Sequence, residues 1–471
     1  MSIALAPPPV DEKLTPLERL EVLCDPGSLE VIRSEVASRH MGDKTRAGDG
    51  VVGGAGRVEG RPVFCYAQDA GYVGGSLGEA HADTIVRVIR LAGRAQAPVV
   101  GFVESGGARM QEGMAALGGY ARIFRETVAL SGRVPQVSVV TGLSAGGGAY
   151  SPALTDFVVM TRAASMFLTG PAVVRDALGE DVSAEDLGGT RVHQRNGVCH
   201  LVADTDAEAA LLTRDLLSYL PERAGRAPAG RPARGPQGSR NPGAVVPTEA
   251  RAVYDVREVT RRVLDDGAFF EVSPGWARNL VTGFGRLDGR SVGVIANQPR
   301  YLGGVLDAGS SEKGARFVKK CDQFGIPLVV LVDTPGYMPG TRQESAGVIR
   351  HGASLVHAFA EARVPKLTVV LRKAYGGAFI TMNSKDLGAD FVFAWPQAEI
   401  GVMGARPAVG IIHRRELAGS DDPERSRRRL ADDYAETHLR PQVAARDGFV
   451  DELIAPSDTR ERLSWALGAL R

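Results

Sequence analysis

Residues 373–380 read KAYGGAFI and follow the apolar run LTVVL, residues 367–371. Two adjacent glycines therefore stand where a buried strand is expected to end. A similar stretch, SAGGGAY at residues 144–150, follows the apolar run VSVV at residues 137–140. Glycine has no Cβ, so its backbone can turn sharply and approach a ligand closely. Because the chain places such bare backbone at a strand end twice, the sequence indicates an internal repeat.

The repeat extends well beyond these two stretches, because several spacings agree in both halves of the chain. The matching features are a glycine pair 24 residues before a proline (Gly74 and Pro98; Gly303 and Pro327) and a proline 11 residues before a second glycine pair (Pro135 and Gly146; Pro365 and Gly376). Pro98 and Pro327 each open an apolar run, VVGFVESGG and LVVLVDTPG. Agreement of several spacings predicts two copies of one fold.

Helix-like segments separate these landmarks. They are predicted at residues 79–95 and 120–132 in the first half and at residues 312–325 and 355–362 in the second. Short apolar strands that alternate with helices predict an α/β fold built from repeated ββα or βα units. The near-continuous apolar strands are typical of a sheet covered on both faces. From Arg414 onward the chain is charged and predicted to be mostly helical, as a cap or packing arm.

A segment rich in Pro, Gly and Arg, residues 221–243, almost lacks apolar side chains and predicts a linker. It contains no aromatic residue that could stack on bases, so a surface linker is favoured over an RNA-binding arm. We therefore expect an N-terminal domain at residues 16–225, a linker at residues 226–249 and a C-terminal domain at residues 250–471.

The bulk composition excludes several classes of function. The 471 residues include 56 Lys and Arg and 55 Asp and Glu, a net charge of +1, which favours neither nucleic acid nor an anionic membrane as partner. No apolar run approaches the roughly 18 residues of a membrane helix, and no secretory leader is recognisable, so a cytoplasmic location is expected. The four cysteines and eight histidines are scattered, so neither a metal site nor a redox pair is expected.

A glycine pair between a strand and a helix suits a negative charge. The first N–H groups of a helix have no intrahelical acceptor, and the helix dipole favours an anion there. Such a turn can hold a phosphate or a developing oxyanion. A tight turn required for packing is the alternative, but two copies at equivalent places favour a function.

Two local features leave alternatives open. The first turn contains the pattern G-x-S-x-G, Gly142 to Gly146, which makes Ser144 a candidate nucleophile of a serine hydrolase. The second half has Ala374 at the equivalent position, and no Asp and His stand out as partners. Arg109, in the loop ESGGARMQEG, could bind a substrate phosphate or form an ion pair. Neither this loop nor GGSLGE matches a Walker A or dinucleotide motif.

Several longer motifs resemble the carboxyltransferase (β) subunit of biotin-dependent acyl-CoA carboxylases. They are SAGGGAYSPALTD, ESGGARMQEG, FLTGPAVV, DTPGYMPGTRQE, RKAYGGAFITMNSK and FAWPQAEIGVMGA. The resemblance covers residues 16–460 and is strongest to the short actinobacterial acetyl-/propionyl-CoA carboxylase β subunits. The cysteine pattern departs from the other bacterial type of acetyl-CoA carboxylase, which carries a zinc ribbon.

The resemblance implies two tandem crotonase-like ββα-spiral domains, in agreement with the repeat. It also implies a ring-like homo-hexamer in which the N-domain of one subunit faces the C-domain of a neighbour. In the implied reaction, carboxybiotin on a carrier protein, loaded by a biotin carboxylase partner, gives its carboxyl group to the α-carbon of an acyl-CoA. Acetyl-CoA would become malonyl-CoA, and propionyl-CoA would become methylmalonyl-CoA. The resemblance implies no metal in this subunit.

The implied reaction develops two oxyanions, one on the thioester oxygen and one on the ureido oxygen of biotin, and the repeat supplies two sets of donors. By the resemblance, Gly146 and Gly147 form the hole for the thioester, and Gly377 and Ala378 form the hole for biotin. The ureido nitrogen is the implied base. The absence of an obvious catalytic His or Asp is therefore expected.

The resemblance implies further substrate contacts. These are the loop Gly106, Gly107 and Ala108 near the acyl-CoA, with Arg109 beside it, and Tyr150 and Ser151 after the first hole. At position 380 the members of the family that prefer propionyl-CoA carry Asp, whereas acetyl-accepting members carry Ile. Because this chain has Ile380, we expect it to use acetyl-CoA, together with propionyl-CoA.

Two further functions stay open. The α subunit of a biotin-dependent acyl-CoA decarboxylase would run the same transfer backwards on malonyl- or glutaconyl-CoA, and would co-purify with a membrane sodium pump. A scaffold without activity in a carboxylase complex is the other. The intact glycine pairs in both halves argue against the scaffold.

Overall fold

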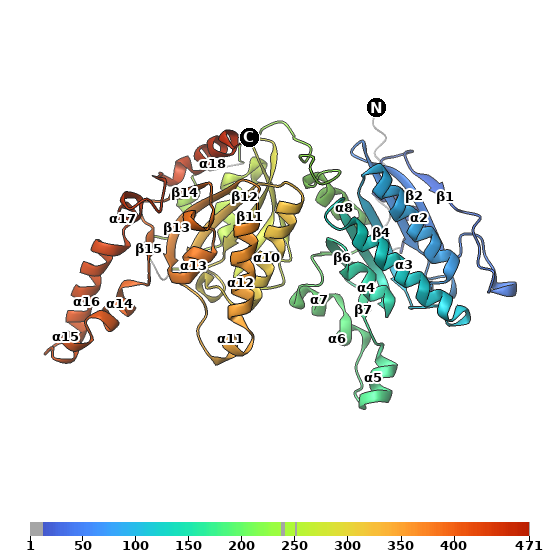
Figure 1. The fold of residues 1–471 in the computed structure, drawn as a ribbon, viewed down its shortest axis with the longest axis horizontal. Coiled ribbons are helices and arrows are strands. Elements are labelled where there is room, and N and C mark those ends of the chain that lie inside the picture. Colours follow the sequence, from blue (N-terminus) through green and yellow to red (C-terminus); the bar gives the residue numbers. More distant parts are fainter. Residues whose placement is uncertain (1–12, 237–240, 250–251, 471) are drawn as a thin grey trace. The chain divides into compact units, whose positions relative to one another are not determined.

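The computed structural model describes residues 13–236, 241–249 and 252–470. The chain divides into two compact units, Met1–Pro228 and Ala229–Arg471, called the N-terminal and C-terminal unit below (Figure 1). Part of the predicted linker, residues 237–240, and the first two residues of the predicted C-terminal domain lie outside the described residues. The linker segment before them is tied to the C-terminal unit, since the N–H of Arg231 donates to the carbonyl of Gly289.

The N-terminal unit holds one sheet and the helices that cover it. Its strands are β1 (Glu30–Ile32), β2 (Val51–Val58), β3 (Arg61–Gln68), β4 (Val99–Ser105), β5 (Gln136–Ala145), β6 (Phe157–Thr161), β7 (Ser165–Phe167) and β8 (Leu201–Ala203). Its α-helices are α1 (Pro16–Leu23), α2 (Glu79–Ala95), α3 (Met114–Leu130), α4 (Gly147–Ala153), α5 (Pro171–Leu178), α6 (Ala184–Gly188), α7 (Thr190–Asn196) and α8 (Asp206–Tyr219).

The C-terminal unit is built in the same way. Its strands are β9 (Phe269–Val272), β10 (Leu280–Leu287), β11 (Arg290–Asn297), β12 (Leu328–Thr334), β13 (Lys366–Tyr375), β14 (Phe391–Ala394), β15 (Glu399–Gly401) and β16 (Glu452–Leu453). Its α-helices are α9 (Val256–Val263), α10 (Ala308–Gln323), α11 (Thr341–Ser345), α12 (Val348–Glu361), α13 (Gly376–Thr381), α14 (Ala405–Ile412), α15 (Arg414–Ala418), α16 (Pro423–Tyr434), α17 (Pro441–Arg446) and α18 (Thr459–Ala469).

The two sheets share one topology. The strand order is β1-β2-β3-β4-β5-β6-β8 in one and β9-β10-β11-β12-β13-β14-β16 in the other, with β7 paired to β5 and β15 paired to β13. In each sheet the first three strands are antiparallel and the rest are parallel. The helices predicted over residues 79–95 and 312–325 are α2 and α10. The predicted α/β repeat therefore corresponds to two copies of one architecture.

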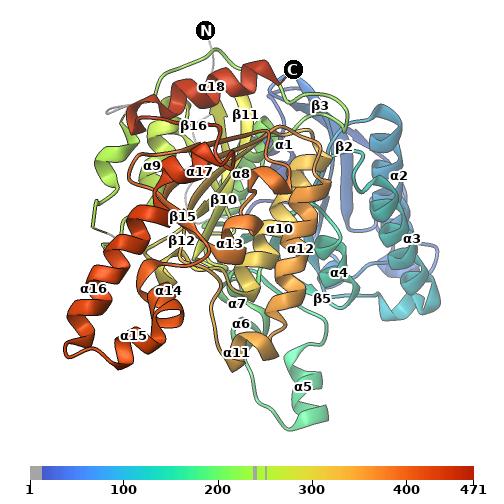
Figure 2. The ribbon, with the colours of Figure 1, turned by 60° about the vertical axis from the view of Figure 1, so that its left-hand side comes forward.

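Alternation along β3 places helices on both faces of the first sheet. Tyr66 belongs to an apolar cluster with Ile85 of α2 and Ile123 of α3, which lie side by side (Figure 1). Its neighbour Cys65 points to the opposite face, where its thiol meets that of Cys24 at the end of α1. In the C-terminal unit, α9 and α18 pack together on one face of the sheet, as the counterparts of α1 and α8 (Figure 2).

In the turns ahead of α2 and α10, steric constraints allow only glycine at one position each. Gly75 has a φ of 69° and Gly304 a φ of 78°, in the left-handed region that favours glycine. A Cβ at Gly75 would overlap the carbonyl oxygen of Glu104, and a Cβ at Gly304 would lie 2.5 Å from that of Asp333. The backbone of each turn therefore rests directly on the end of the neighbouring strand, β4 or β12.

Both sheets bulge at the same place. The register changes from Val103↔Val140 to Ser105↔Ser144 in one sheet and from Val332↔Val370 to Thr334↔Ala374 in the other. The longer strand, β5 or β13, thus carries extra residues opposite β4 or β12, and a bulge of this kind re-aims the strand. It lies just before the glycine turn in each unit.

None of the helices in the described part of the chain combines the length and apolar character needed to span a bilayer.

Candidate active site

In the N-terminal unit, β5 enters α4 through Gly146. This residue has φ 57° and ψ −122°, a conformation open in practice only to glycine. The helix begins at Gly147, so its first N–H groups have no intrahelical acceptor. Within the described residues, neither Gly147 nor Gly148 donates its N–H to any acceptor. Two adjacent donors are therefore presented together at a helix start.

The N–H of Gly146 is not available to a ligand. It donates to the carbonyl of Phe167, on the short strand β7, with an N···O distance of 3.0 Å. Gly146 and Gly147 were predicted as the two donors of the first hole, and this pair moves on by one residue. Gly147 and Gly148 are the two residues of this turn whose N–H groups have no acceptor among the described residues.

The C-terminal unit repeats the turn between β13 and α13. Gly376 has a φ of 56° and corresponds to Gly146. The next two residues are Gly377 and Ala378, the pair predicted for the second hole. Within the described residues their N–H groups also have no acceptor. Gly377 is exposed and Ala378 is fully buried, so the pair lies at the edge of the surface.

The loop at residues 106–108 is held by its own hydrogen bonds. The N–H of Gly106 donates to the carbonyl of Gly74 at 3.0 Å. The N–H of Gly107 donates to the hydroxyl of Ser105 at 3.3 Å. In the described part of the chain, the N–H of Ala108 has no acceptor. The loop thus offers one free donor, at Ala108.

Arg109 is ion-paired rather than open to a phosphate. Its side chain is fully buried, with Nη1 at 2.6 Å from Asp49 and 2.8 Å from Glu112. Nη2 donates to the carbonyl of Ser76 at 3.0 Å. Burial raises the pKa of Asp49, and Arg109 partly offsets that effect. The ion-pair alternative fits this geometry, so we leave Arg109 out of the proposed binding residues.

Ser144 does not have the geometry of a nucleophile. It is fully buried, and its hydroxyl donates to the carbonyl of Gly148 at 2.8 Å. A nucleophile elbow instead exposes its Oγ above the sheet. Ser144 braces the first turn of α4, which argues against the serine hydrolase.

The remaining predicted contacts fall on the two short helices. Tyr150 on α4 and Ile380 on α13 each follow the first glycine of their turn by four residues, and each is 51% exposed. An exposed apolar side chain therefore lies one helical turn beyond each candidate hole. Ser151 is nearly buried, and its hydroxyl donates to the carbonyl of Gly147 at 3.4 Å. Ser151 supports the turn, whereas Tyr150 and Ile380 are open to a substrate.

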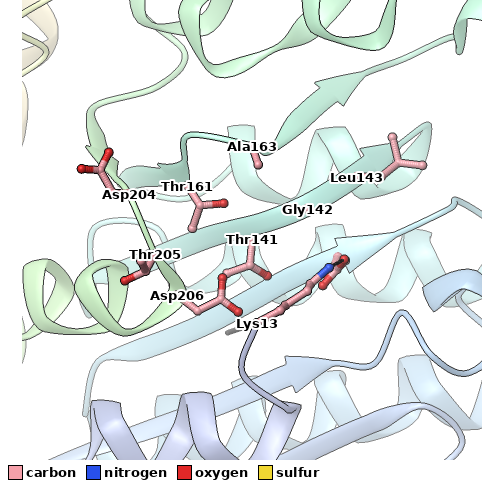
Figure 3. A pocket seen from close by; sticks show the side chains of 10 residues that line it. Lys13, Thr141, Gly142, Leu143, Thr161, Ala163, Asp204, Thr205 and Asp206 are labelled. Carbon is pink, nitrogen blue, oxygen red and sulfur yellow. Dashed lines mark hydrogen bonds and ion pairs between the residues drawn. The ribbon is translucent and has the colours of Figure 1, made fainter. Parts of the chain in front are cut away.

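A cavity of about 420 Å³ borders the bulge of β5, a feature that the sequence reasoning missed (Figure 3). Its lining consists of Lys13, Glu104, Thr141, Gly142, Leu143, Thr161, Ala163, Asp204, Thr205 and Asp206. The Arg19 guanidinium is 3.1 Å from Glu104 and 2.8 Å from Asp206, and Lys13 also pairs with Glu104. A Cβ at Gly142 would overlap the Glu104 carboxylate. Glu104 stands in VVGFVESGG where LVVLVDTPG has Asp333, and this match between the two halves is the sequence signal for a buried acid.

The described residues contain no group of three or more His, Cys, Asp or Glu side chains that could hold a metal ion.

Comparison with known proteins gives a consistent picture. A model of the carboxyl transferase domain matches residues 11–471. The carboxyltransferase subunit of propionyl-CoA carboxylase from Haloferax mediterranei is 47% identical over 96% of this chain and 89% of its own length. The propionyl-CoA carboxylase β chain of Saccharopolyspora erythraea is 48% identical over 97% of this chain and 88% of its own.

A solved structure matches over the same span. It is the transcarboxylase 12S hexamer with methylmalonyl-coenzyme A and methylmalonic acid bound. The two chains are 45% identical with a TM-score of 0.93, over 97% of this chain and 89% of that one. This likeness confirms the predicted fold of two tandem crotonase-like domains.

Proposed function

The chain belongs to the carboxyl transferase family, and we propose that it is the carboxyltransferase (β) subunit of a biotin-dependent acyl-CoA carboxylase. In this role it moves a carboxyl group from carboxybiotin on a carrier protein to the α-carbon of a short acyl-CoA. The observation that carries the proposal is the matched pair of turns. Each unit ends a strand in a glycine of positive φ and then presents two unpaired N–H groups at a helix start.

The chemistry explains why two such turns are needed. Removal of a proton from the α-carbon places negative charge on the thioester oxygen, and Gly147 and Gly148 would donate to that oxygen. Carboxybiotin supplies the carboxyl group and the base. Gly377 and Ala378 would donate to the ureido oxygen as it gains charge. Fixed donors at a helix start stabilise such charge without reorganisation, and each is worth about 3 kcal/mol of barrier.

Propionyl-CoA and acetyl-CoA are the proposed acyl-CoA substrates. Propionyl-CoA is supported by the names of the relatives from Haloferax and Saccharopolyspora. Acetyl-CoA is supported by Ile380, whose exposed side chain follows the second turn. The relative from Mycobacterium tuberculosis, 45% identical, is named for both substrates.

A biotin carboxylase and a biotin carboxyl carrier protein are the proposed partners, because the transferred group has to arrive on biotin. A homo-hexamer is the proposed assembly, because the 45% identical 12S structure is a hexamer.

A transcarboxylase subunit is the second candidate. The 12S subunit of methylmalonyl-CoA carboxyltransferase from Propionibacterium freudenreichii is 45% identical over 97% of this chain. It would use the same two turns, with a methylmalonyl-type thioester as donor of the carboxyl group. The two candidates differ in the compound that loads biotin, and not in the transfer site.

Incubation of the purified chain with a carboxylated biotin carrier protein tests the proposal. Acetyl-, propionyl- and butyryl-CoA are supplied in turn, and the carboxylated thioesters are quantified by mass spectrometry. We expect malonyl-CoA and methylmalonyl-CoA. Failure to carboxylate any of the three, with a carrier that serves another member of the family, would overturn the proposal. Loading of biotin from methylmalonyl-CoA, in the absence of a biotin carboxylase, would favour the transcarboxylase.

A further inference from the structure

Tyr120 lies directly beneath the first candidate hole. This residue of α3 is 5% exposed. A Cβ at Gly147 would lie 2.7–2.8 Å from three carbons of its ring. The backbone that presents the Gly147 N–H therefore rests on the face of an aromatic ring, with no room for a side chain between them.

The Tyr120 hydroxyl connects this helix start to the neighbouring loop. It lies 3.0 Å from the Oγ of Ser105, the last residue of β4. The same Oγ accepts the N–H of Gly107 at 3.3 Å. A Cβ at Gly148 would lie 3.2 Å from the Cβ of Ser105. The pair Ser105 and Tyr120 thus touches both segments that present free donors, the loop at residues 106–108 and the start of α4.

The hydroxyl of Tyr120 stays protonated at neutral pH. Burial raises its pKa to about 12, and the hydrogen bond with Ser105 only partly offsets this. The Tyr120–Ser105 contact is therefore a bond between two neutral hydroxyls, which needs no charged partner in the apolar cluster around it.

The C-terminal unit contains half of this arrangement. Thr334 ends β12 as Ser105 ends β4, and its Oγ1 accepts the N–H of Gly336 at 3.4 Å. No tyrosine hydroxyl is bonded to Thr334 among the described residues. The nearby Tyr337 is bonded instead to Thr381 at 3.2 Å. The hydroxyl at the strand end is thus common to both units, and the tyrosine is an addition at the first turn.

We propose that Ser105 and Tyr120 are positioning residues that set the spacing between the loop at residues 106–108 and the start of α4. This inference rests on the proposed function, because it takes the first turn to be the hole for the thioester oxygen. Donors to a developing oxyanion have to be held within a fraction of an ångström of the productive geometry. A displacement of about 1 Å can lower a rate a hundredfold. The pair acts on the rate of transfer, and not on the affinity for the acyl-CoA.

The test uses four variants of the full chain, assayed with a carboxylated carrier. Tyr120→Phe keeps the ring under Gly147 and removes only the hydroxyl. Ser105→Ala removes the other hydroxyl, and Ser105→Thr restores the residue that the C-terminal unit uses. Tyr66→Phe, which removes a second buried tyrosine hydroxyl from the same apolar cluster, is the matched control.

We expect Tyr120→Phe to lower kcat about tenfold with an acyl-CoA KM within about twofold of wild type, since misplaced donors weaken bonds that form only in the transition state. The double variant Ser105→Ala/Tyr120→Phe should be no slower than Ser105→Ala, because the two residues act as one unit. Ser105→Thr and Tyr66→Phe should keep wild-type kcat, and thermal unfolding should show all variants folded.

Three results would overturn this inference and leave the proposed function standing. They are wild-type kcat in Tyr120→Phe, a double variant whose loss equals the product of the single losses, and a shift of KM without a change of kcat. A wild-type chain that transfers no carboxyl group to any acyl-CoA would overturn the proposed function, and this inference with it.

Discussion

Gly142 on β5 and Arg372 on β13 occupy the same place in the two matching bulges. Each lies two residues before the residue at which pairing resumes, Ser144 or Ala374. The Arg372 guanidinium lies 3.1 Å from Asp333, the buried acid of its own sheet. Gly142 has no side chain to offer, so the equivalent acid is paired from α1 and from the chain ahead of it. The same buried carboxylate is neutralised from within the strand in one unit and from a helix in the other.

The variant Gly142→Ala should destabilise the N-terminal unit. Its methyl group would overlap the Glu104 carboxylate and push it away from Arg19. Overpacking of this kind costs about 1–3 kcal/mol of unfolding free energy. The measurement is the urea midpoint, with Gly468→Ala as control, because a Cβ at Gly468 has open space within 4 Å. Equal midpoints for the two variants would mean that the carboxylate can move freely.

The variants Gly377→Pro and Gly377→Ala separate the donor from the residue. Proline removes the N–H but fits the first turn of a helix, and alanine keeps the N–H. No atom lies within 4 Å of a Cβ at this position. We expect Gly377→Pro to lose about 10²–10³ in kcat, as for other oxyanion donors, and Gly377→Ala to stay within a few-fold of wild type. Equal activity of the two variants would show that this N–H is not a donor in the reaction.

The variant Ile380→Asp should shift substrate preference toward propionyl-CoA. Ile380 is 51% exposed near the end of α13, so the exchange is accommodated without disturbing the core. The two acyl groups differ by one methylene, and a contact with one methylene is worth roughly tenfold in selectivity. The measurement is the ratio of kcat/KM for propionyl-CoA and acetyl-CoA. An unchanged ratio would show that position 380 does not select the substrate.

Stability should fall on acidification because of His81. This side chain is fully buried beside Arg109, and burial lowers its pKa from 6.5 to about 3. Between those values the unfolded chain binds the proton and the folded chain does not, so stability decreases as pH falls below about 6.5 by up to about 1.4 kcal/mol per unit. In the variant His81→Gln the unfolding free energy should fall less steeply between about pH 6.5 and 4.5. Parallel curves for the two proteins would assign the acid sensitivity to other groups.

The architecture was predictable because the intervals between prolines and glycine pairs are the same in both halves of the chain. One proline stands directly before β4 and β12, and another directly before β5 and β13. The equal intervals between these prolines and the glycine pairs therefore predicted the order of strands and helices. The crotonase-like fold itself is confirmed by the likeness to the transcarboxylase 12S structure. The two bulges could not be predicted from the sequence, because Gly142 and Arg372 share no property that a sequence pattern could match.

The two glycine turns were predictable from the sequence, but the N–H groups that each turn leaves without an acceptor were not. The glycine pairs located both turns, but the hydrogen bond from Gly146 to Phe167 depends on β7, a strand of only three residues that pairs beside β5. Such a short strand has no periodicity to detect. The loss of the Gly146 donor is therefore visible only in three dimensions.

The role of Arg109 could not be decided from the sequence, because one of its ion-pair partners is far away in the chain. One of its two counter-ions, Asp49, is 60 residues distant in sequence, in a segment without a recognisable motif, and the other, Glu112, lies three residues on in the same loop. An arginine in a glycine-rich loop fits both a phosphate and an ion pair, and only burial distinguishes them.

The turns at Gly75 and Gly304 carry a consequence for the evolution of both units. Each position is closed to every other amino acid on two independent grounds, a positive φ and a carbonyl oxygen where a Cβ would stand. The preceding glycine of each pair has a positive φ but open space, so an asparagine can be tolerated there. Substitution of the first glycine of each pair should therefore be tolerated more readily than substitution of the second, although this chain keeps both glycines in both halves.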